Sequence, residues 1–485
     1  MIDSAIIKKN HIFVIGSTEP LESAMIFESA LNLISKDENV TVLDLISQSK
    51  SPLNFYFAEK YRLFKHNLLI KKLLKNKKIK IIKFNLKYET MNEYAQDIIS
   101  AAYKAAKLEI ISLKRDIMPC KICNNKHLTR LSNLYLNIYG QFLEFISNTN
   151  NSCIYVYNGR FLIGNACWEV AKVSNNEIRF LEQFTMNKSN EYWIFNKPVH
   201  SIVYRAEVIN DFLENYDKNK FNQLERAGIN WFSDRVNGIS HNFTSDQILI
   251  YQKASNDRKL ISYFPSSEDE LILLGIENEV WGNQKKIISD LADYFYKKGG
   301  IDFTIRLHPN TNHKSGEEVS RLMNFKFELE KKYNFINVIN YNEKINTYSL
   351  IQQSDLVITS GSTVGLEAAF LKIPNILIGD SLYQAMRVAY NPVNLNELKD
   401  NFNSYLADPD KERHYLNALK VGMFHSSGGL PYKFIKMGEN GKNISICNYI
   451  INGSKIYSVC IKIDKFLLNF KKKIIHREAH MKTSL

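Results

Sequence analysis

The sequence predicts an α/β protein built from two Rossmann-like domains. At 485 residues, the chain is too long for one compact hydrophobic core. Short apolar runs alternate with amphipathic helical patterns through both halves, an order typical of parallel sheets covered by helices. A polar, irregular stretch at residues 237–256 separates the two halves. We therefore expect domains at residues 1–245 and 246–395, followed by a helical segment and a basic tail at residues 396–485.

The first half opens with a strand–helix–strand pattern. Residues 11–16 and 40–45 are apolar runs of strand length, and residues 21–35 between them have helical spacing. This order predicts the first Rossmann-like domain. Gly16 is a lone glycine at the end of the first strand, without a G-x-G-x-x-G pattern, so it predicts no dinucleotide site.

Residues 56–83 form a strongly basic segment in which leucines and a phenylalanine recur at helical spacing. A basic amphipathic helix fits the surface of an anionic membrane. A surface helix with a solvated lysine face and its apolar stripe in the core explains the same pattern, and it is the commoner arrangement. Both interpretations stay open at this point.

Two strand ends in the first half carry polar side chains. A strand at residues 153–157 ends at Asn158-Gly159-Arg160, and the next strand ends at Glu182. Arginine is suited to bidentate contact with a carboxylate or a phosphate. A carboxylate at a strand end beside an arginine is typical of a catalytic base, and equally of a structural Arg–Glu pair.

Three turns in the second half follow strands and carry small or polar residues. The strands are expected at residues 259–264, 301–307 and 356–358. Because the carboxyl ends of parallel strands meet at one edge of a sheet, the turns together predict a site for an anionic ligand. The turns are Pro265-Ser266-Ser267, His308-Pro309 and Ser360-Gly361-Ser362-Thr363.

A nucleotide would use these turns in distinct ways. We expect His308 to contact a phosphate, Pro309 to stiffen the turn, and Ser362 and Thr363 to bind phosphate oxygens. Glu367, one helical turn further on, is expected to bind the ribose hydroxyls. The alternative is that Ser360, Ser362 and Thr363 only cap a helix, with Glu367 as an acidic residue of its first turn.

Composition narrows the classes of partner. The formal charge of +13 predicts an anionic partner. The lysines are not interleaved with a platform of aromatic strands, so we expect no nucleic acid. Cys120 and Cys123 form the only close cysteine pair and lack the further ligands of a zinc site, so we expect no metal and no cofactor. No apolar run approaches the roughly 20 residues that span a bilayer, and no signal-peptide pattern is present, which predicts a cytoplasmic protein.

These motifs resemble those of the capsule polysaccharide biosynthesis family of GT-B glycosyltransferases. In the second half the resemblance rests on Ser266-Ser267-Glu268-Asp269-Glu270, Arg306-Leu307-His308-Pro309-Asn310 and residues 354–369. In the first half it rests on Asn158-Gly159-Arg160 with Glu182, and in all it covers about residues 150–385. The His-Pro and Ser/Thr turns are also similar to those of enzymes that use cytidine-nucleotide donors. This chain departs from them in having Ser-Gly-Ser-Thr in place of Ser-Ser.

The resemblance implies a GT-B fold, with two Rossmann-like domains facing across a cleft. The C-terminal domain would bind a nucleotide-sugar donor, with a CMP-linked sugar favoured, and the N-terminal domain a growing surface polysaccharide or lipid-linked glycan. The expected donor-binding residues are Ser266, Ser267, Arg306, His308, Pro309, Ser360, Ser362, Thr363 and Glu367. The expected catalytic residues are Glu182 as base, Arg160, Asn158 and His308, without a metal ion.

Other functions fit parts of the same pattern. A sugar-nucleotide epimerase or a CDP-alcohol phosphotransferase would use the same fold and the same phosphate turns. A non-enzymatic nucleic-acid-binding protein would explain the positive charge alone. For the transferase, a lipid-linked acceptor would give residues 56–83 a role at the inner face of the membrane.

Overall fold

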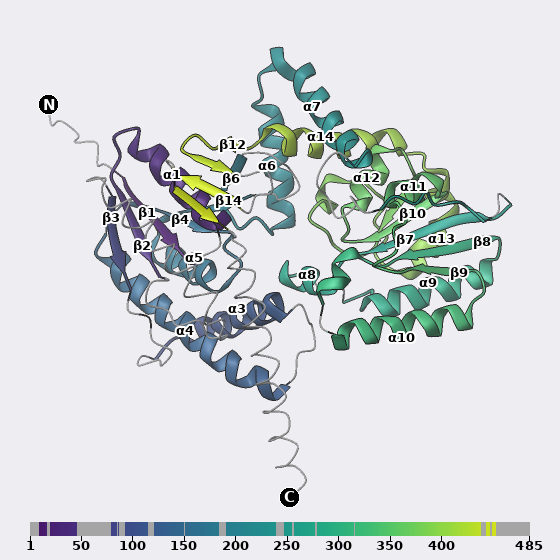
Figure 1. The fold of residues 1–485 in the computed structure, drawn as a ribbon, viewed down its shortest axis with the longest axis horizontal. Coiled ribbons are helices and arrows are strands. Elements are labelled where there is room, and N and C mark those ends of the chain that lie inside the picture. Colours follow the sequence, from purple (N-terminus) through teal and green to yellow (C-terminus); the bar gives the residue numbers. More distant parts are fainter. Residues whose placement is uncertain are drawn as a thin grey trace, which may run out of the picture. The chain divides into compact units, whose positions relative to one another are not determined.

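The computed structural model describes most of the chain. The described residues are 9–16, 20–45, 79–84, 86, 93–114, 121–149, 151–183, 191–238, 247–254, 257–276, 279–314, 316–437, 443–446 and 449–452. They form two compact units (Figure 1). Unit 1 comprises Met1–Lys107, Lys121–Pro198 and Leu430–Leu485, and unit 2 comprises Leu108–Cys120 and Val199–Gly429.

Unit 1 is built on a seven-stranded sheet. Five neighbouring strands are parallel in the order β3-β2-β1-β4-β5. Next to β5, β6 pairs in the antiparallel sense, and β12 pairs antiparallel with β6 at the edge of the sheet. This is the Rossmann strand order. The strands are β1 (Asn10–Ile15), β2 (Val40–Asp44), β3 (Ile79–Lys83), β4 (Ser152–Tyr157), β5 (Glu177–Glu182), β6 (Glu191–Phe195) and β12 (Leu430–Pro431).

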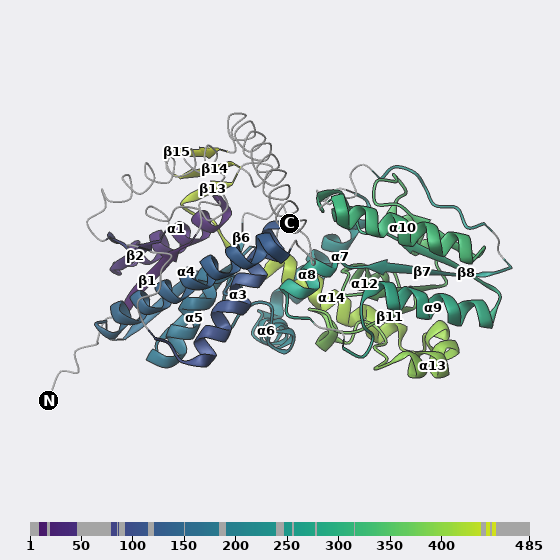
Figure 2. The same ribbon diagram turned by 90° about the horizontal axis from the view of Figure 1, so that it is seen from below.

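Helices cover this sheet on both faces, which is why the last four residues of β1, Ile12–Ile15, are apolar and buried (Figure 2). Phe13 and Ile15 pack with the buried side chains of α1 (Pro20–Ile34). Ile12 and Val14 alternate with them and are buried on the opposite face. The helices that follow α1 in the first half of the chain are α3 (Gln96–Lys114), α4 (Lys121–Ser147) and α5 (Leu162–Ser174).

The opening βαβ pattern is confirmed by β1, α1 and β2. The helix predicted across the basic segment is wrong for its last five residues, because Ile79–Lys83 pairs with β2 as a parallel strand. The rest of that prediction, residues 56–78, lies outside the described residues.

Unit 2 contains a five-stranded parallel sheet in the order β11-β10-β7-β8-β9, again the Rossmann order. The strands predicted at 259–264, 301–307 and 356–358 are confirmed as β7, β8 and β10. The complete set is β7 (Lys259–Pro265), β8 (Ile301–Arg306), β9 (Ile336–Ile339), β10 (Leu356–Ser360) and β11 (Asn375–Leu377). Two Rossmann-like domains in one α/β chain, as the sequence predicts, are therefore present.

The core of unit 2 lies on both faces of this sheet. On β10, Leu356 and Ile358 pack into one apolar cluster and Val357 into another, as the twofold periodicity of a strand requires. The first cluster is shared with helices α9 (Gln284–Lys298), α10 (Gly316–Lys332) and α13 (Leu395–Ala407). The second is shared with α11 (Thr347–Gln353) and α12 (Val364–Phe370).

The unit boundary lies at Pro198 and not near residue 245, because three helices outside the sheet belong to unit 2. They are α6 (Ile202–Glu214), α7 (Phe221–Val236) and α14 (Lys411–Ser427). Gly228 of α7 and Gly422 of α14 let the helix backbones approach, since a Cβ on Gly422 would lie 3.0 Å from the Gly228 carbonyl oxygen. Leu224, Leu419 and Met423 are buried at the same contact.

The C-terminal part is helical only at first. After α13 and α14 the chain forms β12 and then a small antiparallel sheet in unit 1. Its strands are β13 (Ile435–Met437), β14 (Asn443–Ile446) and β15 (Tyr449–Asn452). Residues 453–485, which hold most of the predicted basic tail, lie outside the described residues. No helix in the described part of the chain is long and apolar enough to cross a membrane.

Candidate functional site

The three predicted turns of unit 2 follow three neighbouring strands. β7 lies between β10 and β8, so the turns after Ser360, Pro265 and Arg306 come at consecutive strand ends of one sheet edge. The chain fills the sheet on one side of β7 first and then crosses to the other side at β10. This reversal of strand order is the place where open α/β sheets bind ligands.

The turn after β10 has a backbone that requires glycine. Gly361 has φ +75°, and a Cβ there would lie 2.5 Å from the side chain of Leu271. Ser360, just before it, is fully buried, and its hydroxyl pairs with the hydroxyl of Tyr263 at 2.9 Å. Ser360 therefore belongs to the framework beneath the turn and does not face a ligand.

Ser362 and Thr363 differ from one another. The Ser362 hydroxyl accepts a hydrogen bond from the amide of Val364 at 3.3 Å, a long distance that makes it a weak helix cap. Thr363 is half-buried, and its side chain makes no capping hydrogen bond. The alternative in which these residues only cap a helix thus holds in part for Ser362 and does not hold for Thr363.

The structure pairs Glu367 with a residue that the sequence interpretation missed. Arg235 of α7 donates to Glu367 Oε1 from Nε at 3.0 Å and also from Nη2. The two side chains are 4% and 5% exposed. Since this carboxylate is buried in an ion pair, the structure corrects the prediction that Glu367 faces a ribose. No local pattern could have indicated the pair, because its members are separated by 132 residues.

The two serines in the turn after β7 also differ from one another. Ser267 is buried, and its hydroxyl donates to Asp269. Asp269 also forms a buried ion pair with Lys314, at 3.2 Å. Ser266 is half-buried, and its amide donates to the carbonyl oxygen of Ser360 at 3.1 Å, which fixes this turn to the one after β10.

At the end of β8, Arg306 and His308 have different roles. Arg306 is buried and donates to the carbonyl oxygens of Asn340 at 3.3 Å and Glu343 at 3.0 Å. Burial lowers the pKa of this guanidinium to about 10, although the charge of Glu343 opposes the shift. Arg306 therefore anchors the loop after β9, which corrects its assignment to the donor. His308 is half-buried, and the chain turns at Pro309 into a short 3-10 helix.

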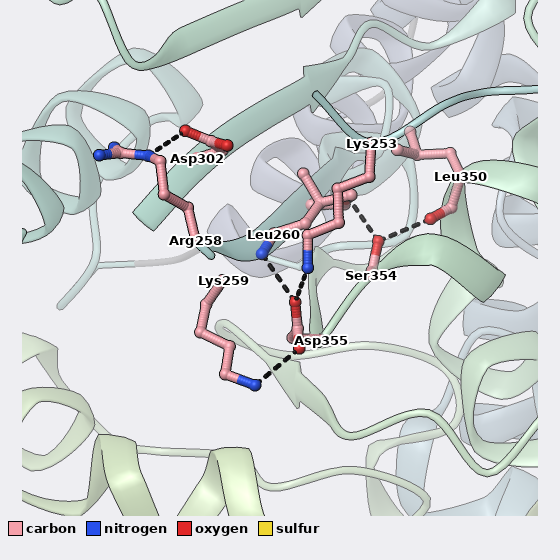
Figure 3. Close-up of polar contacts among 9 residues, drawn as sticks. Lys253, Arg258, Lys259, Leu260, Asp302, Leu350, Ser354 and Asp355 are labelled. Carbon is pink, nitrogen blue, oxygen red and sulfur yellow. Dashed lines mark hydrogen bonds and ion pairs between the residues drawn. The ribbon is translucent and has the colours of Figure 1, made fainter. Parts of the chain in front are cut away.

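Residues 354–369, the stretch that contains the turn after β10, begin at the opposite edge of the sheet (Figure 3). Asp355, at the amino end of β10, accepts hydrogen bonds from Lys253 at 2.7 Å, Lys259 at 3.0 Å and the amide of Leu260 at 2.8 Å. Burial would raise the pKa of Asp355, but these hydrogen bonds outweigh it and lower the pKa. The beginning of the motif therefore fixes the strands, and only its end reaches the candidate site.

Unit 1 brings Asn158 and Glu182 together. They follow the neighbouring strands β4 and β5, and Asn158 Nδ2 donates to Glu182 Oε2 in a buried contact. The other carboxylate oxygen accepts from the amide of Gln183 at 3.0 Å. The guanidinium of Arg160 lies 4.6 Å from the centre of the Phe161 ring. Asn158 and not Arg160 is thus the residue whose side chain is seen to hold the Glu182 carboxylate.

The amide at the end of β1 has a partner within unit 1. The amide of Gly16, at the end of β1, donates to Glu22 Oε1 at 2.9 Å. A carboxylate therefore occupies the position where an anionic ligand of a Rossmann turn would accept this hydrogen bond. Among the described residues there is no group of three or more His, Cys, Asp or Glu side chains suited to a metal ion.

Comparison with known proteins gives similarity in structure only. No protein-family model matches the chain, and no curated protein does. The β-Kdo 2,4 transferase KpsC of Thermosulfurimonas dismutans is similar at 14% identity over 56% of this chain and 78% of its own, with a TM-score of 0.35. The trehalose 6-phosphate synthase of Burkholderia multivorans is similar at 9% identity over 87% and 96%, with a TM-score of 0.37. UDP-GlcNAc 2-epimerase from Neisseria meningitidis, bound to UDP-GlcNAc, is similar at 12% identity over 86% and 97%, with a TM-score of 0.28.

Proposed function

We propose that the protein is a GT-B glycosyltransferase. It moves a sugar from a nucleotide-sugar donor, CMP-linked by preference, to a growing surface polysaccharide or lipid-linked glycan. The observation that carries the proposal is the succession of Ser266, His308 and Thr363 at three neighbouring strand ends, where the strand order of unit 2 reverses. The motif resemblance to the capsule polysaccharide family supports the same assignment.

The chemistry divides between the units. In unit 2, His308 and the hydroxyls of Ser362 and Thr363 bind the donor phosphate. The bond from the anomeric carbon to the phosphate oxygen breaks, and these groups stabilise the negative charge that develops on the phosphate. Such preorganised donors contribute most where charge appears in the transition state, so loss of His308 should affect kcat as well as donor binding.

In unit 1, Glu182 acts as the general base. It accepts the proton of the acceptor hydroxyl as the new bond to the anomeric carbon forms. Asn158 holds one carboxylate oxygen of Glu182, and the amide of Gln183 holds the other. This leaves the carboxylate in one orientation, which is what a proton transfer to a fixed acceptor requires.

A thermal-shift panel tests the donor site directly. CMP, CDP, UDP, GDP and ADP are added to the wild type, to His308→Ala and to His11→Ala, a control for a half-buried histidine in unit 1. A ligand at a hundred times its dissociation constant adds about 2.7 kcal/mol to the free energy of unfolding. We expect one nucleotide to stabilise the wild type and the control but not His308→Ala. No stabilisation by any nucleotide would refute the proposal.

Turnover then separates the transferase from its rivals. A transferase consumes its donor only when an acceptor is added, whereas an epimerase converts the donor alone. A CDP-alcohol phosphotransferase would be stabilised by CDP and inactive with nucleotide sugars. Binding of nucleic acid that weakens steeply with salt, without nucleotide binding, would favour the non-enzymatic alternative.

We also propose that the basic residues before β3, residues 56–78 of the predicted segment 56–83, hold the protein at an anionic membrane surface, where a lipid-linked acceptor is presented. The support is the charge of the segment, and residues 56–78 lie outside the described part of the chain. Replacing Lys71, Lys72 and Lys75 by glutamate should abolish binding to vesicles that contain phosphatidylserine. Unchanged binding of this variant would contradict the proposal.

A further inference from the structure

We infer that Glu191, together with Asn158, binds hydroxyl groups of an uncharged sugar beside Glu182 in unit 1. The inference rests on the proposed function and names the class of acceptor. Glu191 begins β6, which runs antiparallel to β5, so it lies at the edge of the sheet where β5 ends. The register places Trp193 opposite Glu182. Glu191 is therefore the diagonal neighbour of Glu182, at about 7–8 Å between Cα atoms.

Asn158, Glu182 and Glu191 share one face of this sheet. The residues beside them in sequence pack into the apolar cluster with α1 on the opposite face: Tyr157, Leu181 and Tyr192. Since side chains alternate along a strand, the three polar side chains point away from α1. The hydrogen bond from Asn158 to Glu182 agrees with this placement. At the sheet edge, β12 pairs with the first residues of β6 and holds the backbone of Glu191 in the sheet.

Two buried oxygen atoms of this group have no hydrogen-bond partner among the described residues. A carboxylate only accepts, so the amide nitrogen of Asn158 faces Glu182 and its Oδ1 is left over. The second atom is Glu191 Oε2. Asn158 is only 4% exposed, whereas Glu191 is half-buried, so the group opens to solvent on the Glu191 side. Because buried side-chain oxygens are mostly hydrogen-bonded, two that are not, at one strand end, point to a ligand.

The two atoms determine the chemistry of that ligand, because both are acceptors. A sugar hydroxyl donates to an amide oxygen or a carboxylate, whereas an ionised phosphate or carboxylate supplies no donor. An ionised Glu191 also repels an anion. The nearest cation in sequence, Arg160, packs its guanidinium on the Phe161 ring at 4.6 Å and does not pair with Glu191. Burial raises the pKa of Glu191, as expected for a carboxyl without a neighbouring cation. The site therefore fits an uncharged, hydroxyl-rich end of the acceptor glycan.

Methyl glucoside and methyl glucuronide test this preference, because they carry the same ring hydroxyls and differ in charge at C6. The corresponding galactose pair covers a second ring configuration. Saturation-transfer NMR compares their binding to the full chain, to Glu191→Gln and to the control Glu177→Gln. Glu177 begins β5, at the opposite edge of the same sheet. We expect the wild type and the control to bind a neutral glycoside about tenfold more tightly than its anionic counterpart.

Glu191→Gln keeps the shape of the side chain and removes its charge, so the two members of a pair should bind it about equally. Glu191→Ala, which also removes the acceptor oxygens, should lose binding of the neutral glycoside. A purely structural role would lower the melting temperature of these variants without changing the preference between the sugars.

Three results overturn the inference: the wild type binds neither neutral glycoside, it prefers the anionic ones, or Glu191→Gln keeps the wild-type preference. If His308→Ala loses nucleotide binding but Glu191→Gln changes nothing, the proposed function stands and only this inference falls. If no nucleotide stabilises the wild type but Glu191→Gln abolishes the preference, the sugar site stands and the proposed function falls.

Discussion

Breaking the buried ion pair between Arg235 and Glu367 should destabilise unit 2 strongly. The guanidinium donates twice to the carboxylate, both side chains are at least 95% buried, and the Trp231 ring lies 4.6 Å from the guanidinium carbon. Burial alone would lower the pKa of Arg235, but the Glu367 carboxylate outweighs it and raises the pKa. Removing the charge of either partner leaves the other buried without compensation.

The cost of each single substitution is therefore about 3–5 kcal/mol. For a domain of about 150–250 residues, each kcal/mol lowers the melting temperature by about 2–4 °C, so we expect a drop of about 6–20 °C. The double variant R235M/E367Q has no buried charge at this position and should lose less than the sum of the two single changes. The assay is thermal unfolding of wild type, R235M, E367Q and the double variant, followed by tryptophan fluorescence.

An exposed ion pair of the same unit provides the control. Lys372 and Glu412 approach to 2.8 Å but are 41% and 67% exposed, so E412Q should change the free energy of unfolding by less than about 1 kcal/mol. The reasoning is refuted if E367Q melts like the wild type. If E367Q also loses nucleotide binding without losing stability, Glu367 faces the ligand, as the sequence alone predicted.

Three further predictions concern other parts of the molecule. The buried Glu28 carboxylate accepts the amides of residues 433–435 at 2.8–2.9 Å, so E28Q should cost about 2–3 kcal/mol and speed hydrogen exchange at those amides. Burial holds the pKa of His425 well below its ordinary value, so below about pH 6.5 the unfolded chain takes up a proton that the folded chain does not. Stability should then fall by about 1.4 kcal/mol per pH unit from this group, and H425Q should flatten that slope in urea titrations. In unit 1, Gly159→Ala should cost about 2–4 kcal/mol in thermal unfolding, because the backbone has φ +79° and a Cβ would overlap the Phe180 ring.

Each of these has an outcome that would contradict it. Gly238 has φ +68° with nothing near its missing Cβ, so G238A should cost only about 1 kcal/mol, and equal costs at both glycines would exclude the steric explanation. Unchanged exchange at the amides in E28Q would show that this carboxylate does not hold residues 433–435 in place. A slope that persists in H425Q would assign the acid sensitivity to other groups.

The sequence predicts the parts of this fold that depend on local chemistry. Alternating burial on β10 and the small residues after it are encoded within one short stretch, so strand, turn and sheet edge follow from periodicity. His308 and Thr363 were placed at one edge for the same reason, since parallel strands share their carboxyl ends.

Partners far apart in the chain are not encoded locally. Nothing in the sequence near Arg235 or Glu367 indicates that the two side chains pair, and only the packing of α7 near the turn after β10 buries them together. Asp269 and Lys314 are equally unremarkable in sequence, yet they tie two turns. The sequence therefore predicts which turns form the candidate site but not which of their side chains are already bound within the fold. The ribose role of Glu367 and the donor role of Arg306 were mistaken for this reason.

The route of the chain through unit 1 has a consequence for synthesis on the ribosome. Glu28 of α1 cannot form its hydrogen bonds until the amides at residues 433–435 have been synthesised. The whole of Val199–Gly429 is translated in between. At about 5–20 residues per second, this takes about 12–46 s. During that time the nascent chain carries a carboxylate without its backbone partners and a sheet without β12, while the inserted unit is free to fold first. Stalled chains ending near residue 425 should therefore be cleaved by protease within unit 1, and chains that extend well past residue 470 should resist it.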